Sequence, residues 1–219
     1  MHVRIHPSIL AADFANLESA VRDVSTADAV HVDVMDNHFV PSLTFGPQMV
    51  QSLAEVSPIP LDVHLMIVDP DTYAAEYARI GAESVTFHVE AATDPQGVID
   101  AIHAEGGQAG IAIKPGTPLA PHLPLLHSAD LVLVMTVEPG AGGQAFLPEV
   151  MPKLAELRTY LTEHGLSPLV QVDGGITVKT LPVALAEGAD TFVAGSSVFG
   201  HGTPADNIRA LRGAATQGE

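Results

Sequence analysis

The sequence predicts an α/β protein that forms a (β/α)8 barrel, and three observations lead to this prediction. Short runs rich in valine and isoleucine alternate with amphipathic stretches along the whole chain, and turns rich in Gly, Pro and Asp separate them. Such alternation is typical of parallel strands joined by helices. Eight units in 219 residues fit most economically into one closed barrel, with a doubly wound open sheet as the alternative. No linker or low-complexity run interrupts the pattern, so we expect one domain over residues 1–219.

The elements can be placed in order from their residue types. Runs rich in β-branched residues predict the strands, at residues 3–10, 29–36, 61–67, 84–90, 108–115, 131–138, 169–175 and 191–197. Amphipathic stretches between them predict the helices, at residues 16–24, 47–56, 71–82, 95–106, 147–165, 178–188 and 204–214. The segment 117–129 is rich in proline, which interrupts regular helices, so we expect a short or irregular helix there.

Composition and charge limit the classes of function. Apolar residues make up 47% of the chain, enough for a large core, and the absence of cysteine excludes disulfides, thiolate metal sites and a cysteine nucleophile. Neither a signal peptide nor a membrane-spanning apolar run is recognised, so we expect a cytoplasmic protein. The net charge of −17 argues against nucleic acid or an anionic membrane as a partner. An anionic small molecule would need local backbone N–H groups and helix N-termini to hold it.

Polar side chains recur on one face of three predicted strands. Side chains two positions apart share a strand face, so His31 and Asp33 point to the same side of the second strand. His64 lies in the third strand, and Asp173 near the end of the seventh. Because active groups of a (β/α)8 barrel sit at the C-terminal ends of its strands, we expect these four side chains to lie close together.

A divalent metal would explain such a cluster. Buried carboxylates repel each other and lose solvation unless a cation or hydrogen bonds compensate. Two imidazoles and two carboxylates suit Zn²⁺, Fe²⁺, Mn²⁺ or Co²⁺, and the ligand types do not choose among these metals. Each residue taken singly could instead be a hydrogen-bonded residue of the core or the barrel rim.

Glycine-rich turns after the last three predicted strands suggest a phosphate site. The candidates are Gly142 with Gly143, Gly174 with Gly175, and Gly195 with Ser196. Glycines let backbone N–H groups approach an anion closely, and the loops after strands seven and eight are the usual phosphate site of such barrels. A single turn of this kind would be ordinary turn chemistry.

The chain closely resembles the ribulose-phosphate 3-epimerase family over nearly its whole length. The matching stretches are PSILAADFANL, HVDVMDNHFVPSLTFGP, DVHLMI, IKPGTP, VEPGAGGQAF, VDGGI and VAGSSVF. The resemblance implies metal ligation by His31, Asp33, His64 and Asp173, with Asp33 and Asp173 as the acid/base pair. It also implies substrate or phosphate contacts from Ser8, His64, Gly140, Ala141, Gly142, Gly143, Asp173, Gly174, Gly175, Gly195 and Ser196. Met35, Met66 and Met135 match a group of methionines that caps the site, although ordinary core packing would also explain them.

Two positions depart from the family pattern, and the oligomeric state is only an expectation. The family usually has an aromatic residue where this chain has Ala141, and asparagine where it has Ser42. Ala141 should leave that loop less packed over the substrate, which bears on the exact sugar more than on the reaction. Because members of the family form dimers and larger rings, we expect a homo-oligomer.

The implied reaction accounts for the residue types. Epimerising C3 of a 2-ketose phosphate removes a proton next to a carbonyl and returns one to the other face, through an enediolate. A metal held at O2 and O3 would stabilise the negative charge, and two carboxylates on opposite faces would exchange the protons. We therefore predict interconversion of D-ribulose 5-phosphate and D-xylulose 5-phosphate.

Three other functions are compatible with parts of the sequence. A 3-epimerase of a ketohexose 6-phosphate would use the same residues. An aldolase could form a Schiff base on Lys114, which follows the fifth predicted strand, but it would not need the His and Asp cluster. A non-catalytic sugar-phosphate-binding barrel would be favoured by loss of an acid/base carboxylate, and both carboxylates are present.

Overall fold

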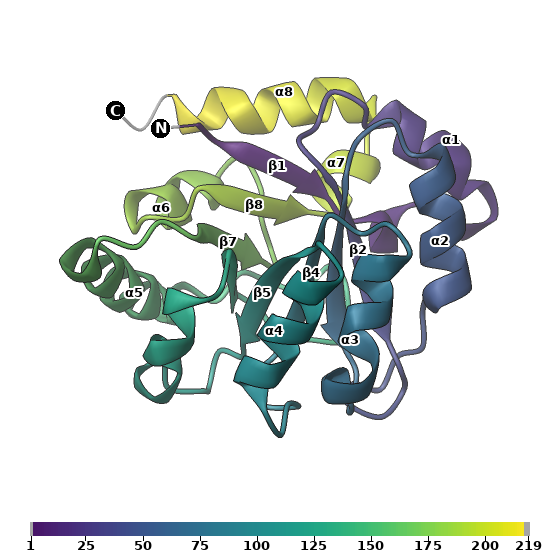
Figure 1. Cartoon of the computed structure of the whole chain (residues 1–219). Helices are drawn as coiled ribbons and strands as arrows, with labels where there is room; N and C mark the ends of the chain where they lie inside the picture. The colour runs from purple at the N-terminus through teal and green to yellow at the C-terminus, as the bar shows by residue number, and fades with distance from the viewer. Residues whose placement is uncertain (1, 217–219) are drawn as a thin grey trace.

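The computed structural model describes residues 2–216, and it confirms the predicted (β/α)8 fold class. Eight parallel strands form one sheet, in the order β1-β8-β7-β6-β5-β4-β3-β2. The strands are β1 (Arg4–Pro7), β2 (Val30–Met35), β3 (Leu61–Met66), β4 (Ser84–His88), β5 (Gln108–Ile113), β6 (Leu131–Met135), β7 (Leu169–Asp173) and β8 (Thr191–Ala194). Helices surround the sheet on the outside (Figure 1).

The first and second strands close the barrel through few contacts. Ser8, just after β1, forms an isolated parallel bridge with His31 of β2. Asp28 supports the same junction, because its backbone N–H donates to Ile5 O at 3.1 Å and its carboxylate accepts from Ile5 N at 2.8 Å. The barrel therefore closes beside His31, one of the predicted site residues.

Most of the helices begin with a proline in one of their first two positions. The helices are α1 (Leu17–Asp23), α2 (Pro47–Val56), α3 (Pro70–Arg79), α4 (Pro95–Ala104), α5 (Met151–His164), α6 (Leu181–Ala186), α7 (Ser196–Phe199) and α8 (Pro204–Ala215). The Asp69 side chain caps α3 by accepting the backbone N–H of Thr72, and the Asp94 side chain caps α4 by accepting the backbone N–H of Gly97. Proline suits the first helical position because its missing N–H would have no partner there.

The two faces of the strands have different roles. Val30, Val32 and Val34 of β2 pack with α2 residues such as Val50 in the main hydrophobic core. His31 and Asp33 alternate with these valines along the strand, and their side chains are buried in the barrel interior. The packing between strands and helices thus stabilises the fold, and it leaves the inward face free for polar groups.

Several predicted boundaries were wrong at the C-terminal ends of strands. The predicted strand 3–10 ends at Pro7, because Ser8 caps the 3-10 helix η1 (Ile9–Ala11). The predicted strand 191–197 ends at Ala194, and Ser196 begins α7.

The structure also contains short 3-10 segments. The predicted helix 147–165 starts as the 3-10 helix η4 (Pro148–Val150) before α5, and a 3-10 turn, η2 (Phe14–Asn16), precedes α1. The proline-rich segment forms the 3-10 helix η3 (Ala120–His127), with Pro124 inside it.

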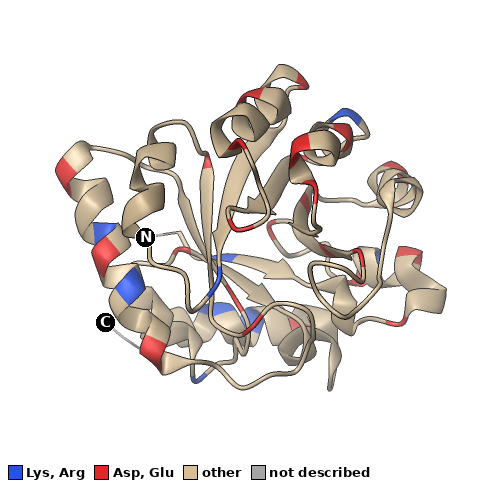
Figure 2. Cartoon of the chain, turned by 90° about the horizontal axis from the view of Figure 1, so that it is seen from below, with Lys and Arg blue, Asp and Glu red and all other residues tan. Residues whose placement is uncertain are grey.

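Among residues 2–216, acidic residues are spread over several outer helices and loops (Figure 2). This distribution agrees with a solvated acidic surface as the main origin of the net charge of −17. Among residues 2–216, the helices are too short or too polar for any of them to cross a membrane.

Candidate metal and catalytic site

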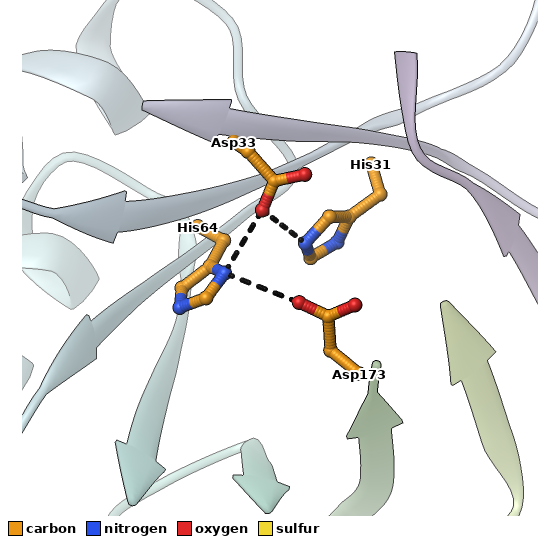
Figure 3. A group of neighbouring side chains, drawn as sticks. All are labelled: His31, Asp33, His64 and Asp173. Carbon is orange, nitrogen blue, oxygen red and sulfur yellow. Dashed lines mark hydrogen bonds and ion pairs between the residues drawn. The ribbon is translucent and has the colours of Figure 1, made fainter. Parts of the chain in front are cut away.

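The four predicted side chains meet inside the barrel near the C-terminal ends of the strands (Figure 3). One ligand atom from each of His31, Asp33, His64 and Asp173 lies within 4.8 Å of the others. Strand register produces this meeting, because Asp33 of β2 pairs directly with His64 of β3. Asp173 reaches the same space from the end of β7.

One nitrogen of His31 shows that the cluster fits a cation. His31 Nε2 is fully buried, lies 3.3 Å from Asp33 Oδ1, and makes no hydrogen bond. Its other nitrogen, Nδ1, contacts Asp62 Oδ2 at 2.8 Å. A carboxylate behind Nδ1 leaves Nε2 free to bind a metal, which is the usual arrangement of a ligating histidine.

Asp62 anchors a polar network below the cluster that the sequence analysis did not identify. This buried carboxylate also contacts His6 at 2.8 Å, and it accepts hydrogen bonds from Ser84 at 2.7 Å and Gln171 at 2.6 Å. The network therefore holds Asp62, and through it His31, with side chains from β1, β4 and β7. Its signal in the sequence was the position of Asp62 two residues before His64, on the same strand face.

Asp33 lies in surroundings that favour its ionised form. It is 3% exposed, receives a hydrogen bond from Ser8 Oγ at 2.5 Å, and lies 3.1 Å from His64 Nδ1. Burial alone would raise the pKa of Asp33, but the charge of His31 and the contacts with His64 hold this pKa well below its usual range.

Asp173 lies in surroundings that favour its protonated form. Its side chain is 17% exposed, and its closest ionic contact is His64 Nδ1 at 3.8 Å. Burial and the negative charge of Asp33 raise the pKa of Asp173 to about 6. The two predicted acid/base groups thus differ in their affinity for a proton.

The surroundings of His31 favour its protonated form, and a bound metal would compete with that proton. Burial alone would lower the pKa of His31, but the Asp33 and Asp62 carboxylates raise it well above its usual value. Metals bind the deprotonated imidazole, so metal binding to this cluster should release protons.

A second group that the sequence analysis missed lies behind His64. Nε2 of His64 is 3.0 Å from Nε2 of His88 in β4, and His88 Nδ1 is 3.1 Å from Glu90 Oε2. Burial lowers the pKa of His88 to about 4. Burial alone would raise the pKa of Glu90, but hydrogen bonds, led by that from His88, lower it to about 2. The same two-residue spacing that marked His31 and Asp33 could have identified this pair.

A cavity of about 790 Å³ opens above the cluster. This volume suits a small molecule. Of the predicted residues, it is lined by Ser8, Asp33, Met35, Met66, Met135, Gly140, Ala141, Gly142, Gly143, Asp173, Gly174, Gly175, Gly195 and Ser196. His31 and His64 lie buried beside it and do not line it.

The glycine turns bring bare backbone to this cavity. Gly175 has a φ of 66°, and a Cβ there would overlap the backbone nitrogen of Phe146, so the turn has no room for a side chain. Among the described residues, the N–H groups of Gly175, Gly195 and Ser196 donate to no other backbone group. These donors are therefore available to an anion in the cavity.

Two residues discussed from the sequence have other surroundings. Ser42 Oγ donates to Gly140 O at 2.7 Å, which joins the loop after β2 to the loop after β6. Lys114 lies outside the cavity lining, and its Nζ sits 3.9 Å from the centre of the Phe39 ring. This position does not favour a Schiff-base role for Lys114.

Fold and site together define a (β/α)8 barrel with a candidate metal and acid/base centre at the C-terminal ends of its strands. The model of the Ribulose-phosphate 3 epimerase family matches residues 4–199. The chain belongs to this family.

Individual relatives agree with this assignment. The chain is 52% identical to the ribulose-phosphate 3-epimerase of Mycobacterium leprae over 95% of its own length and 93% of that protein. It is 42% identical to the enzyme of the same name from Bacillus subtilis, over 96% and 99% of the two chains. The crystal structure of KGPDC from Streptococcus mutans shares the fold, with a TM-score of 0.75, 17% identity and 99% coverage of both chains.

Proposed function

We propose that this protein interconverts D-ribulose 5-phosphate and D-xylulose 5-phosphate by epimerising C3. The observation that carries the proposal is the convergence of two histidines and two aspartates within 4.8 Å, below a cavity lined by glycine turns, in a chain of the ribulose-phosphate 3-epimerase family. The relatives named above bear the name of this activity.

His31, Asp33, His64 and Asp173 would hold one divalent cation, and Zn²⁺, Fe²⁺, Mn²⁺ and Co²⁺ all suit these ligands. When bound, the cation would supply positive charge that stabilises an enediolate. Asp33 and Asp173 would exchange protons with C3 on opposite faces of the sugar.

Ser8 would keep Asp33 in place through its 2.5 Å hydrogen bond. Met35, Met66 and Met135, all buried at the cavity wall, would limit access of water.

The glycine turns would hold the phosphate. The N–H groups of Gly175, Gly195 and Ser196 point to this role because they have no backbone partner among the described residues. Ser196→Asp would place a negative charge there, and we expect KM to rise at least tenfold by charge repulsion. Ser52→Asp, on the exposed side of α2, adds the same charge away from the cavity and should leave KM unchanged.

An epimerase assay combined with elemental analysis tests the proposed function. Protein purified without oxygen should contain one divalent metal, lose activity when a chelator removes it, and regain activity on reloading. Side-by-side kinetics with a pentulose 5-phosphate and a hexulose 6-phosphate decide between the two epimerase substrates, and we expect the pentulose to be preferred. A folded, metal-loaded protein that epimerises neither sugar would refute the proposal. A cytoplasmic homo-oligomer remains our expectation for the protein in the cell.

A further inference from the structure

The imidazole of His64 uses both of its nitrogens. Nδ1 faces Asp33 at 3.1 Å and Asp173 at 3.8 Å, whereas Nε2 lies 3.0 Å from Nε2 of His88. His88 in turn places Nδ1 3.1 Å from Glu90 Oε2. One further side chain, that of His88, therefore links the candidate metal cluster to the Glu90 carboxylate just after β4.

The Glu90 carboxylate determines which nitrogen carries the proton in the rings of His88 and His64. An ionised carboxylate only accepts hydrogen bonds, so His88 must donate from Nδ1. A neutral His88 then has a lone pair on Nε2, and His64 must donate its Nε2 proton to it. The neutral form of His64 therefore keeps its lone pair on Nδ1, the nitrogen that faces the cluster.

The surroundings of Glu90 and His88 hold the series of hydrogen bonds from Glu90 to His64 in this arrangement. Glu90 Oε1 accepts the backbone N–H of Lys114 at 2.8 Å, so both carboxylate oxygens of Glu90 are acceptors. The His88 side chain has no exposed surface, and its ring centre lies 4.9 Å from that of Phe39. The Lys114 ammonium lies on the Phe39 ring. These contacts leave the chain little freedom to rearrange.

We propose that Glu90 is a positioning residue, which acts through His88 to keep the Nδ1 lone pair of His64 directed at the bound metal. His31 has a carboxylate, Asp62, directly behind it, whereas His64 reaches its carboxylate through a second imidazole. This inference rests on the proposed function for the presence of a metal in the cluster.

Removing the carboxylate should release this constraint. An amide at position 90 offers one acceptor and one donor, so it either places a donor against His88 Nδ1 or sets two donors against each other at Lys114. In the first orientation the donor and acceptor roles of His88 and His64 are exchanged. Neutral His64 then carries its proton on Nδ1, where it opposes metal binding. A leucine at position 90 can neither accept nor donate.

Co²⁺ affinity of the chelator-treated, full-length protein tests the proposal. We expect Glu90→Gln and Glu90→Leu to bind Co²⁺ roughly 10–100-fold more weakly than wild type, the usual effect of losing a partner behind a metal ligand. Glu83→Gln, at the exposed residue before β4, should bind like wild type. Thermal unfolding confirms that the variants are folded. Unchanged affinity in both Glu90 variants would overturn the proposal.

A double-mutant cycle separates this route from simple attraction between Glu90 and the cation. His88→Phe removes the connection but keeps a ring beside Phe39. If Glu90 acts through His88, the loss caused by Glu90→Gln should nearly disappear in the His88→Phe background. An equal loss in both backgrounds would overturn the proposal, because attraction through space does not need His88. Ring ¹⁵N NMR of the wild-type protein gives a second check, because it shows which nitrogen of His88 carries the proton. We expect the proton on Nδ1, and a proton on Nε2 instead would overturn the proposal.

These measurements do not depend on turnover. If the wild-type protein binds Co²⁺ and the cycle behaves as expected but no sugar is epimerised, the proposed function fails and the role of Glu90 stands. If the sugar is epimerised and the Glu90 variants bind Co²⁺ normally, only the role of Glu90 fails. A wild-type protein without affinity for Co²⁺ would refute the metal site on which the inference rests.

Discussion

Asp33 and Asp173 have the same side chain and face the same cluster, yet their surroundings differ. The side chain of Asp33 is 4% exposed, accepts a hydrogen bond from Ser8 and lies 3.1 Å from His64 Nδ1, whereas the side chain of Asp173 is 17% exposed and lies 3.8 Å from its nearest ionic partner. The pKa of Asp33 is held well below its usual range, and that of Asp173 is raised to about 6. Local hydrogen bonding and charge, rather than residue type, therefore divide the pair.

This difference suits a reaction that needs one ionised and one protonated carboxylate. In the metal-free protein we expect Asp33 to be ionised and Asp173 to hold a proton up to about pH 6. A bound cation would lower the pKa of both residues, because it favours the charged form of each. Their hydrogen-bond partners would still distinguish them, since Ser8 donates to Asp33 alone.

The largest expected effect is on turnover. Asp33→Asn and Asp173→Asn keep the side-chain shape but remove the exchangeable proton, so each should lower kcat about a hundredfold or more. Because both groups act on one intermediate, the double variant should be little worse than either single variant. Steady-state kinetics of the metal-loaded proteins measure this, with Asp23→Asn, an exposed aspartate of α1, as the control.

Isotope exchange shows whether the two carboxylates have separate roles. In deuterated water, product from the wild-type enzyme should carry deuterium at C3, because a different group returns the proton. Near wild-type turnover in one Asp→Asn variant would indicate a single-base enzyme. Full retention of the substrate hydrogen at C3 would exclude the opposed-carboxylate scheme.

A smaller effect concerns the stability of the metal-free protein. The folded-state pKa of Asp173 is about 6, above the usual 3.8, so the folded state binds more protons than the unfolded state between these values. The stability from this residue is present below about pH 4 and is lost as the pH rises through 6. Asp173→Asn should therefore raise the free energy of unfolding at pH 8 by up to roughly 2–3 kcal/mol, and should change it little at pH 4.

Asp33→Asn should have the opposite sign. The folded-state pKa of Asp33 is lowered, so its contribution to stability is present above the ordinary carboxyl pKa and is lost as the pH falls. We expect this variant to be destabilised at pH 8. Urea unfolding of chelator-treated proteins at both pH values measures the two shifts, and shifts of equal sign would contradict the difference between the two aspartates.

The sequence predicted the fold and the four cluster residues for a simple reason. Strand alternation and the position of strand ends follow from local pattern, and His31, Asp33, His64 and Asp173 all lie on predicted strands. The ends of the strands were less predictable. Ser8 and Ser196 follow β-branched or apolar runs, but capping and a sharp turn end the strands before them.

The residues behind the cluster could not be ranked from the sequence. Asp62, His88 and Glu90 also lie on or just after strands, but only the packed barrel shows that Asp62 contacts His31 and that His88 contacts His64. The opposite pKa shifts of Asp33 and Asp173 depend on partners from other strands. Such contacts join residues far apart in sequence, and local pattern carries no information about them.

The smallest expected effect on catalysis tests the partner that distinguishes Asp33. Ser8 Oγ donates to Asp33 Oδ2 at 2.5 Å and has no contact of this kind with Asp173. Ser8→Ala removes a hydrogen bond to a charged group, which should cost roughly 1.5–3 kcal/mol of stability at neutral pH. It should also raise the pKa of Asp33 and make this residue more like Asp173.

The pH dependence of kcat/KM measures that change. Because loss of the Ser8 hydrogen bond disfavours the ionised form of Asp33, the acid limb of the profile should move to higher pH in Ser8→Ala, and kcat/KM at neutral pH should fall several-fold. Ser52→Ala, on the exposed side of α2, should leave the profile unchanged. An acid limb that stays in place in a folded Ser8→Ala variant would mean that the histidines alone keep Asp33 ionised. The difference between the two carboxylates would then originate in His31 and His64.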